Sequence, residues 1–260
     1  MKKIFYNLGQ ILLNIFARIW ALWGLISFVS TFLIIIIPAL LTYFVSDPKG
    51  QTLFIKIAKI WMDIWLLLIL CPLKVKGKEH FANGETYIIT FNHNTLLDVP
   101  ITCPYIPGAN KTIAKKSFTK IPLFGLFYSK GAVLVDRKNP ASRIKSYDEM
   151  KKTLFQKIHM CIFPEGTRNR TKEPLKSFYD GAFKLSVDTN NAIIPTLLFN
   201  TSKAMPNNKF FYLLPHKLEM HFLEPIAPEY LSSAELKEIV FEKMWSYHIF
   251  CAVYLTAFFI

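Results

Sequence analysis

The sequence predicts an α/β fold, in which helices flank a central mixed sheet and an N-terminal hydrophobic, membrane-associating helix pair precedes the sheet. From residue 74 onward, short apolar runs alternate with amphipathic stretches and turn residues, which is typical of a globular α/β domain. Several runs are continuously apolar, as in strands covered on both faces. Before them, residues 19–46 form an uncharged run of 28 residues, longer than the ~20 needed to cross a bilayer core.

We expect the first 73 residues to be a membrane-associating helical module. The uncharged run is about twice as long as a signal-peptide core of ~7 to 15 residues and lacks a cleavage pattern, so it is retained. Residues 53–73 carry three charges in their first half and then turn apolar, as in an interfacial or re-entrant helix. Gly24 and Pro38 interrupt the long run, so a spanning helix and a hairpin in one leaflet are equal alternatives.

The catalytic part is predicted over residues 74–248, followed by an apolar tail over 249–260. Residues 107–184 hold 17 Lys or Arg against 6 Asp or Glu, which favours the cytoplasmic side of the membrane. The tail is too short to span a bilayer alone, so we expect it to pack on the N-terminal module or to dip into lipid.

The predicted elements follow in order along the chain. Apolar runs predict strands over residues 87–91, 112–114, 132–135, 160–163, 192–199 and 218–222. Helical spacing predicts helices over residues 141–156, 178–189 and 233–247, and a serine N-cap precedes the last of them.

Composition narrows the partners. With 52% hydrophobic and 19% charged residues the chain is not disordered, and its net charge of +13 indicates an anionic partner: nucleic acid, a phosphorylated metabolite or an acidic membrane. The four cysteines lie far apart without a CxxC pair, which argues against zinc and against a disulfide scaffold. A reducing compartment fits this pattern, and no metal is expected.

The first candidate catalytic residues follow the strand predicted over 87–91. His93 and Asp98 are five residues apart, about 140° around an ideal helix, so they can meet only if His93 precedes the helix. The carboxylate then accepts one imidazole proton and leaves the other nitrogen as a base. Because the chain has no GxSxG nucleophile elbow, this base would activate a hydroxyl of the substrate. A histidine that merely caps a helix fits the lone pair equally well.

Two further motifs follow predicted strands. Residues 163–168 read Phe-Pro-Glu-Gly-Thr-Arg, which brings a glutamate, a turn and an arginine to the same sheet edge. The strand over 132–135 ends in Asp136 and Arg137, and Lys115 lies upstream. An arginine fork suits phosphate or carboxylate, although neighbouring Asp and Arg residues more often form a surface ion pair.

The order of these motifs resembles that of the glycerolipid acyltransferase family, and most closely the 1-acyl-sn-glycerol-3-phosphate (lysophosphatidic acid) acyltransferases. The family pattern Asn-His-x4-Asp matches Asn92, His93 and Asp98, and residues 163–168 match its Phe-Pro-Glu-Gly-Thr-Arg block in full. The matches to its Gly-x3-Val-Asp-Arg and apolar proline blocks are Gly131, Val135, Asp136, Arg137 and Ile193 to Thr196. Resemblance extends over about residues 74–223, and the chain departs from it at Lys116-Ser117-Phe118.

The resemblance implies a role for each residue. His93 would deprotonate the acceptor hydroxyl and Asp98 would orient the imidazole, so that the alkoxide attacks an acyl thioester without a covalent enzyme intermediate. Arg168, helped by Arg137 and Lys115, would bind the phosphate of the acceptor. The full substrate-binding set implied is Asn92, Lys115, Arg137, Glu165, Gly166, Thr167 and Arg168, in which Glu165 and the Gly166–Thr167 turn would order the phosphate site.

The implied partners are membrane lipids, lysophosphatidic acid as acceptor, and acyl-CoA or acyl carrier protein as donor, with no cofactor and no nucleic acid. The alternative is the same chemistry on another lyso-lipid or on glycerol 3-phosphate. A remote alternative is a basic, membrane-bound nucleic-acid-binding protein, but the basic region lacks the aromatic platform of single-strand binders. An inactive lipid-binding scaffold would need a broken His-Asp pair, and both residues are present.

Overall fold

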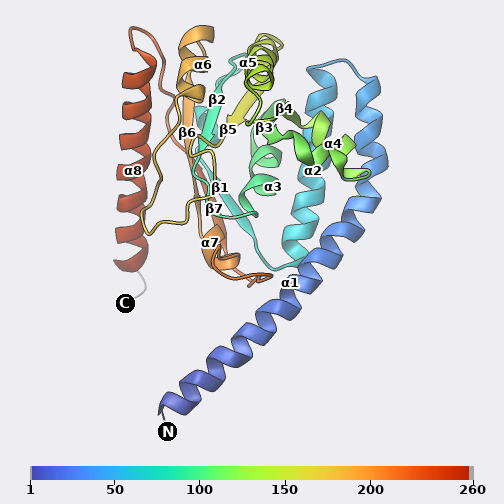
Figure 1. Cartoon of the computed structure of the whole chain (residues 1–260), viewed down its shortest axis with the longest axis vertical. Coiled ribbons are helices and arrows are strands. Elements are labelled where there is room, and N and C mark those ends of the chain that lie inside the picture. The colour runs from blue at the N-terminus through green and yellow to red at the C-terminus, as the bar shows by residue number, and fades with distance from the viewer. Residues whose placement is uncertain (1, 258–260) are drawn as a thin grey trace.

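A seven-stranded mixed sheet forms the centre of the molecule in this computed structural model, which describes residues 2–257 and the side chains of residues 7–251 (Figure 1). The strand order is β1-β7-β6-β2-β5-β3-β4, and only β6 and β7 pair antiparallel. The strands are β1 (Leu73–Lys76), β2 (Ile88–Phe91), β3 (Asn110–Lys115), β4 (Ala132–Val135), β5 (His159–Ile162), β6 (Ile193–Phe199) and β7 (Leu218–Phe222). The predicted mixed sheet is therefore confirmed.

All six predicted strands are present within two residues of their expected ends. The sequence prediction missed β1, which pairs only with β7 at the edge of the sheet. Its four residues alternate between partly buried and exposed positions, so the segment lacks the continuous apolar run that marks the central strands.

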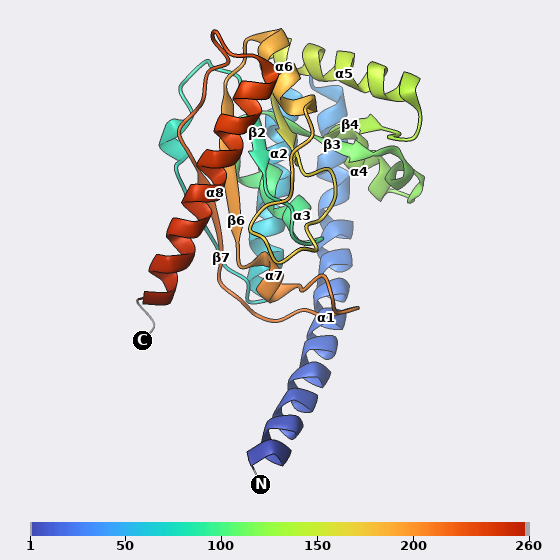
Figure 2. The ribbon, with the colours of Figure 1, turned by 60° about the vertical axis from the view of Figure 1, so that its left-hand side comes forward.

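Helices cover both faces of the sheet (Figures 1 and 2). One face carries α5 (Pro140–Phe155), α6 (Gly181–Thr189) and α8 (Ser233–Ala257). The other carries α1 (Lys2–Leu41), α2 (Lys49–Leu68), α3 (Asp98–Thr102) and α4 (Phe124–Lys130). A single turn, α7 (Thr201–Ala204), follows β6, and short 3-10 helices span Thr42–Phe44, Lys78–His80, Cys103–Tyr105 and Lys116–Lys120.

The two N-terminal helices pack against each other through aromatic side chains of α2. The indole nitrogen of Trp61 donates to the Thr31 hydroxyl and that of Trp65 donates to the Gly24 carbonyl, both at 2.9 Å. The Phe28 ring lies 4.7 Å and 5.0 Å from the same two indole rings, between centroids. That these packed helices associate with a membrane stays a prediction.

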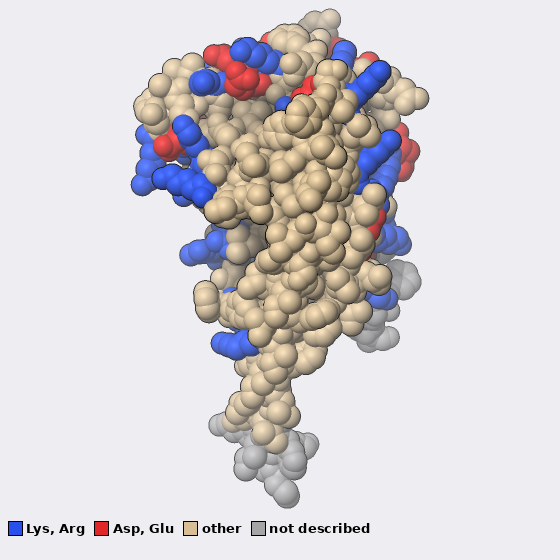
Figure 3. Space-filling view, turned by 90° about the vertical axis from the view of Figure 1, so that its right-hand side faces the viewer, with Lys and Arg blue, Asp and Glu red and all other residues tan. Residues whose placement is uncertain are grey.

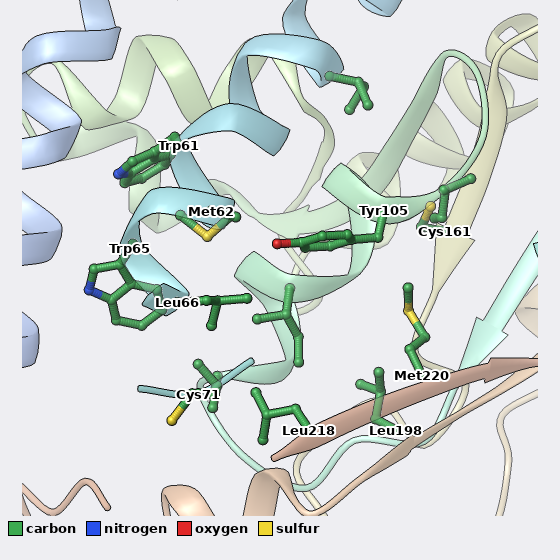
Figure 4. Close-up of a cluster of buried hydrophobic side chains, with 14 of the residues drawn as sticks. Trp61, Met62, Trp65, Leu66, Cys71, Tyr105, Cys161, Leu198, Leu218 and Met220 are labelled. Atoms are coloured by element: carbon green, nitrogen blue, oxygen red, sulfur yellow. The ribbon is translucent and has the colours of Figure 1, made fainter. Parts of the chain in front are cut away.

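The N-terminal helices share a hydrophobic core with the sheet. Met62 and Leu66 of α2 point toward side chains of the sheet and of the 3-10 helix at Tyr105, whereas Trp61 and Trp65 point toward α1, as Figure 4 shows. These residues are buried, and each large apolar side chain contributes roughly 1.5 to 3 kcal/mol when fully removed from water. Removal of α2 would therefore expose part of the sheet face that it covers together with α1, α3 and α4.

The apolar tail predicted over residues 249–260 continues the last helix as far as residue 257, and its predicted contact with lipid stays a prediction. The predicted helix ends at residue 247, but α8 continues to Ala257 because the chain has neither Gly nor Pro from residue 233 onward. It lies on the face of the sheet opposite α1 and α2, so the tail does not pack on the N-terminal module as far as residue 257 (Figures 1 and 2). The remainder of the predicted tail, 258–260, lies outside the described residues.

Residues 7–44 form an apolar helical stretch of 38 residues that is long enough, by length and composition, to cross a membrane. Only a third of its apolar window is buried in the fold. Figure 3 shows the face that α1 presents: its centre is free of charged side chains, and Lys and Arg gather toward its margins. The exposed residues of α1 include Leu33, Ile34 and Ile37.

Candidate active site

The predicted motifs meet at one edge of the sheet because β2, β5, β3 and β4 are parallel neighbours in that order. His93 follows β2, residues 163–168 follow β5, Lys115 ends β3, and Arg137 follows β4. Carboxyl ends of adjacent parallel strands face the same crevice, which is where open α/β sheets place their sites.

His93 and Asp98 form a hydrogen-bonded pair at this edge. The imidazole Nδ1 lies 2.9 Å from Asp98 Oδ2. Asp98 is the first residue of α3, so His93 precedes the helix, and the turn between them lets side chains five residues apart meet. The carboxylate is fully buried, whereas the imidazole is 15% exposed. With Nδ1 facing a carboxylate, Nε2 is the nitrogen left to act as a base.

The carboxylate of Asp98 is held by its own turn. Its Oδ2 also accepts the backbone N–H groups of Asn94 at 2.5 Å and Thr95 at 2.7 Å, and its Oδ1 lies 3.3 Å from the Thr95 hydroxyl. The sequence analysis did not single out Thr95, although a threonine three residues before an acidic residue is the pattern of a capping box. This network fixes the orientation of the carboxylate that orients the imidazole.

The loop after β5 clamps the backbone of His93. Glu165 Oε1 accepts the His93 N–H at 2.8 Å, and the Asn169 N–H donates to the His93 carbonyl at 2.6 Å. The Phe163 ring packs against the imidazole, with 4.5 Å between centroids. Because both backbone groups of His93 are bonded to one loop, that loop sets the position of the base.

Asn92 and Glu165, two members of the predicted substrate-binding set, bond to backbone groups around the site, which fits the ordering role expected of Glu165. Both are fully buried. The amide of Asn92 donates to the Leu198 carbonyl at 3.0 Å and accepts the Leu198 N–H at 2.7 Å, while Glu165 Oε2 accepts the Lys176 N–H at 3.2 Å. Buried polar side chains pair with nearby polar groups, so these hydrogen bonds fix the orientation of both side chains.

Gly166 and Thr167 form the turn beside this clamp. Gly166 has φ +69°, and a Cβ there would lie 2.7 Å from the Tyr179 ring, so only glycine fits. The exposed Thr167 hydroxyl accepts a hydrogen bond from the Lys176 ammonium at 2.8 Å. Lys176 was not identified from sequence, because nothing in its local pattern links it to the motif ten residues upstream.

The predicted phosphate-binding cations Arg137 and Arg168 have different hydrogen-bond partners. Arg137 donates to the Gly166 carbonyl from the β4 side, where Lys115 is also exposed. Arg168 instead lies 3.5 Å from the Asn207 amide oxygen, in the segment that follows α7. Asn207 also donates to the Asn94 and Asn169 carbonyls, so it belongs to the site although the sequence analysis did not identify it.

An apolar cavity of about 390 Å³ opens beside His93. Its walls include Trp61, Leu96, Phe127 and Ala132, and none of its lining residues carries a formal charge apart from the titratable His93. Such a cavity suits an apolar chain whose end must reach the base. Among the residues that the structure describes, no group of three or more His, Cys, Asp or Glu side chains could hold a metal ion. The expectation of no metal and no cofactor stays a prediction.

Burial raises the pKa of Glu165 from 4.5 to about 7, and the negative charge of Asp98 adds to this, although the N–H groups of His93 and Lys176 oppose it. The folded state therefore holds a proton on Glu165 at pH values where the unfolded chain has lost it. The contribution of Glu165 to the free energy of unfolding is therefore fully present below pH 4.5, decreases above it, and is lost as the pH rises through about 7.

We expect the free energy of unfolding of the wild type, relative to Glu165→Gln, to fall by on the order of 3 kcal/mol between pH 4.5 and pH 8. Urea unfolding of both proteins across this range measures the difference. The glutamine cannot titrate, so it serves as the matched control. A difference that stays constant with pH would show that Glu165 keeps an ordinary pKa.

Comparisons with known proteins agree with this geometry. Residues 72–198 match the family model described as Acyltransferase. Curated relatives include a 1-acyl-sn-glycerol-3-phosphate acyltransferase of Cocos nucifera, 32% identical over 61% of this chain and 51% of the relative, and one of Saccharomyces cerevisiae, 29% identical over 70% of this chain and 60% of the relative. The chain thus spans between half and three fifths of the length of these two relatives.

A solved structure shares the fold. The crystal structure of the 1-acyl-sn-glycerophosphate acyltransferase PlsC from Thermotoga maritima has a TM-score of 0.75 and 21% sequence identity to this chain. The similarity covers 89% of this chain and 94% of that one.

Proposed function

We propose, from the match of residues 72–198 to the family model described as Acyltransferase, that this chain moves a fatty acyl group from an acyl thioester to the free sn-2 hydroxyl of lysophosphatidic acid, giving phosphatidic acid. The observation that carries the proposal is the His93–Asp98 pair, 2.9 Å apart, at the mouth of an apolar cavity. The names of the relatives support the choice of acceptor.

The reaction uses His93 as a base and then as an acid. As the hydroxyl oxygen attacks the thioester carbonyl, its proton passes to the imidazole Nε2, and Asp98 stabilises the imidazolium that forms. The tetrahedral intermediate then collapses, the carbon–sulfur bond breaks, and the departing thiolate takes the proton back. No group of the enzyme becomes acylated, which accords with the lack of a nucleophile elbow in the sequence.

The cavity beside His93 would take the acyl chain of the donor. His93 lines the cavity, so a chain inside it ends in a thioester carbon within reach of the base. Transfer of the chain from water into the cavity would contribute roughly 0.8 kcal/mol of binding free energy for each buried methylene, so long chains would bind more tightly.

An acyl-transfer assay on the purified chain tests the proposal. Lysophosphatidic acid, glycerol 3-phosphate and other lyso-lipids serve as acceptors, each with acyl-CoA and with acyl carrier protein as donor. We expect phosphatidic acid as the main product. Preferred transfer to another acceptor would show that the chain acts on that acceptor class instead of lysophosphatidic acid. No transfer with either donor would overturn the proposal.

We also propose that the protein resides on a membrane with its catalytic part on the cytoplasmic face. The exposed apolar stretch of α1 and the uncharged centre of its face support this (Figure 3). We expect the chain to stay in the membrane pellet after carbonate extraction, which removes proteins held by charge alone. Full release into the supernatant would contradict burial of α1 in lipid.

A further inference from the structure

A second hollow, of about 780 Å³, lies between α1 and the segment that precedes β7. We name it the α1 groove. Its walls come from five parts of the chain: residues 21–28 of α1, Trp65 of α2, residues 96–100 after β2, residues 168–170 after β5, and residues 205–213. Figure 2 shows the segment after α7 running across to α1.

The lining of the α1 groove combines cationic and apolar residues. Its cations are Arg168, which lies beside Asn207, Arg170, and Lys209, whose ammonium lies over the Tyr212 ring. The apolar residues, here called the body of the groove, include Leu25, Phe28 and Leu213. A ligand that matches this distribution carries an anionic headgroup on a single apolar chain, because the guanidinium fork suits phosphate and the body suits methylene groups.

Segment 205–213 is held in place on both sides. The Leu213 N–H donates to the Ala17 carbonyl at 3.2 Å, and the Lys209 ammonium reaches Asn14 at 3.3 Å. A Cβ on Gly24 would lie 2.7 Å from Leu213, so glycine permits this close approach. Asn207 ties the other end of the segment to the active-site loops. The groove is therefore present before any ligand arrives.

The α1 groove and the cavity beside His93 share a wall. Phe28, Leu96 and Pro100 line both hollows, but His93 lines only the cavity. The donor chain must end at the reacting carbon, next to His93, and so belongs in the cavity. The acceptor chain is separated from its reacting hydroxyl by the glycerol carbons. It can therefore lie in the α1 groove, on the other side of the shared wall and near the cations.

We propose that the α1 groove binds the acyl chain of the monoacyl phosphate acceptor, with its phosphate at Arg168 and Arg170; this rests on the proposed function above. Phe210, 91% exposed at the groove, adds an apolar side chain next to the exposed face of α1, from which a lipid would arrive. The acceptor then enters along α1 while the donor chain occupies the cavity.

The first experiment measures chain-length preference with monomeric acceptors. Each buried methylene is worth up to roughly fourfold in affinity when the reference state is water, so hexanoyl and decanoyl lysophosphatidic acid are compared below their micelle concentrations. We expect the wild type to prefer the decanoyl acceptor by at least about tenfold in kcat/KM. No preference would show that the acceptor chain stays outside the protein.

Leu25→Trp narrows the groove, and it should fold because Leu25 is 51% exposed. We expect its preference for the decanoyl acceptor to fall to about threefold or less, with an unchanged preference among donor chain lengths. Ala58→Val is the matched variant, because Ala58 lines only the cavity; it should change the donor preference alone. Ile34→Trp, on an exposed position of α1 that lines neither hollow, should change neither preference.

A binding measurement separates this inference from the proposed function. Lysophosphatidic acid with a diazirine at the chain end should label residues 21–25 and 205–213, which line only the groove, whether or not the enzyme turns over. Label on residues 54–62 and on α4, which line only the cavity, would overturn the groove assignment even if phosphatidic acid is made. The groove assignment would also be overturned if Leu25→Trp changed the donor preference, or if it left both preferences unchanged. Failure of the acyl-transfer assay alone would count against the proposed function.

Discussion

His93→Ala is expected to lower kcat by about 10²- to 10⁴-fold with little change in stability. The imidazole lines the apolar cavity, and only its Nδ1 contacts Asp98, so loss of the side chain removes Nε2 as the base. The fold should persist because the clamp on His93 uses its backbone N–H and carbonyl, which alanine keeps. Turnover is measured at saturating acceptor, and thermal unfolding checks the fold.

Asp98→Asn tests the same pair from its other side. The amide would still orient the imidazole but would no longer stabilise the imidazolium by charge, so we expect a comparable loss of kcat. His80→Ala, at a histidine of the 3-10 helix Lys78–His80 outside the site, is the control and should keep full turnover. Near wild-type turnover in either His93→Ala or Asp98→Asn would show that the pair only caps α3.

Arg168→Ala is expected to lower kcat/KM for lysophosphatidic acid by at least about tenfold. A phosphate monoester carries nearly two negative charges at neutral pH, and loss of one charged hydrogen-bond partner costs ~1.5 to 3 kcal/mol. Monoacylglycerol lacks the phosphate, so its slower reaction should change much less. Arg168→Lys should recover only part of the loss, because an ammonium cannot form the two-pronged contact.

The matched control is Arg143→Ala, which removes the same charge from an exposed position of α5 and should leave both acceptors unaffected. Equal losses for lysophosphatidic acid and monoacylglycerol in Arg168→Ala would show that Arg168 does not read phosphate. A wild type that used both acceptors equally would favour the other acceptor classes.

The placement of the motifs follows from the sequence alone. Apolar runs locate β2, β4 and β5, and a parallel strand brings whatever follows it to the same edge of the sheet. The pairing of His93 with Asp98 is also local, because five residues and one turn determine it. Likewise, the length of the uncharged run predicts the long apolar helix that α1 forms.

The remaining features depend on contacts between distant segments. The cavity beside His93 takes its walls from α1, α2 and the region around β3 and β4, and the α1 groove joins residues 21–28 to residues 205–213. Arg137 bonds to the Gly166 carbonyl and Arg168 to the Asn207 amide oxygen, and both partners lie on other segments of the chain than the arginine itself. Edge strand β1 exists only because β7 supplies its hydrogen bonds.

The burial of Asn92 and Glu165 shows the physical reason most directly. A sequence pattern states that a residue is polar and where its strand ends, and both statements hold for these two residues. Whether the polar group faces substrate or backbone is decided by the neighbouring segment, here Leu198 for Asn92, and His93 and Lys176 for Glu165. Local sequence therefore determined the order of the elements and the chemistry available at the sheet edge, whereas tertiary packing decided which of those groups are free to bind.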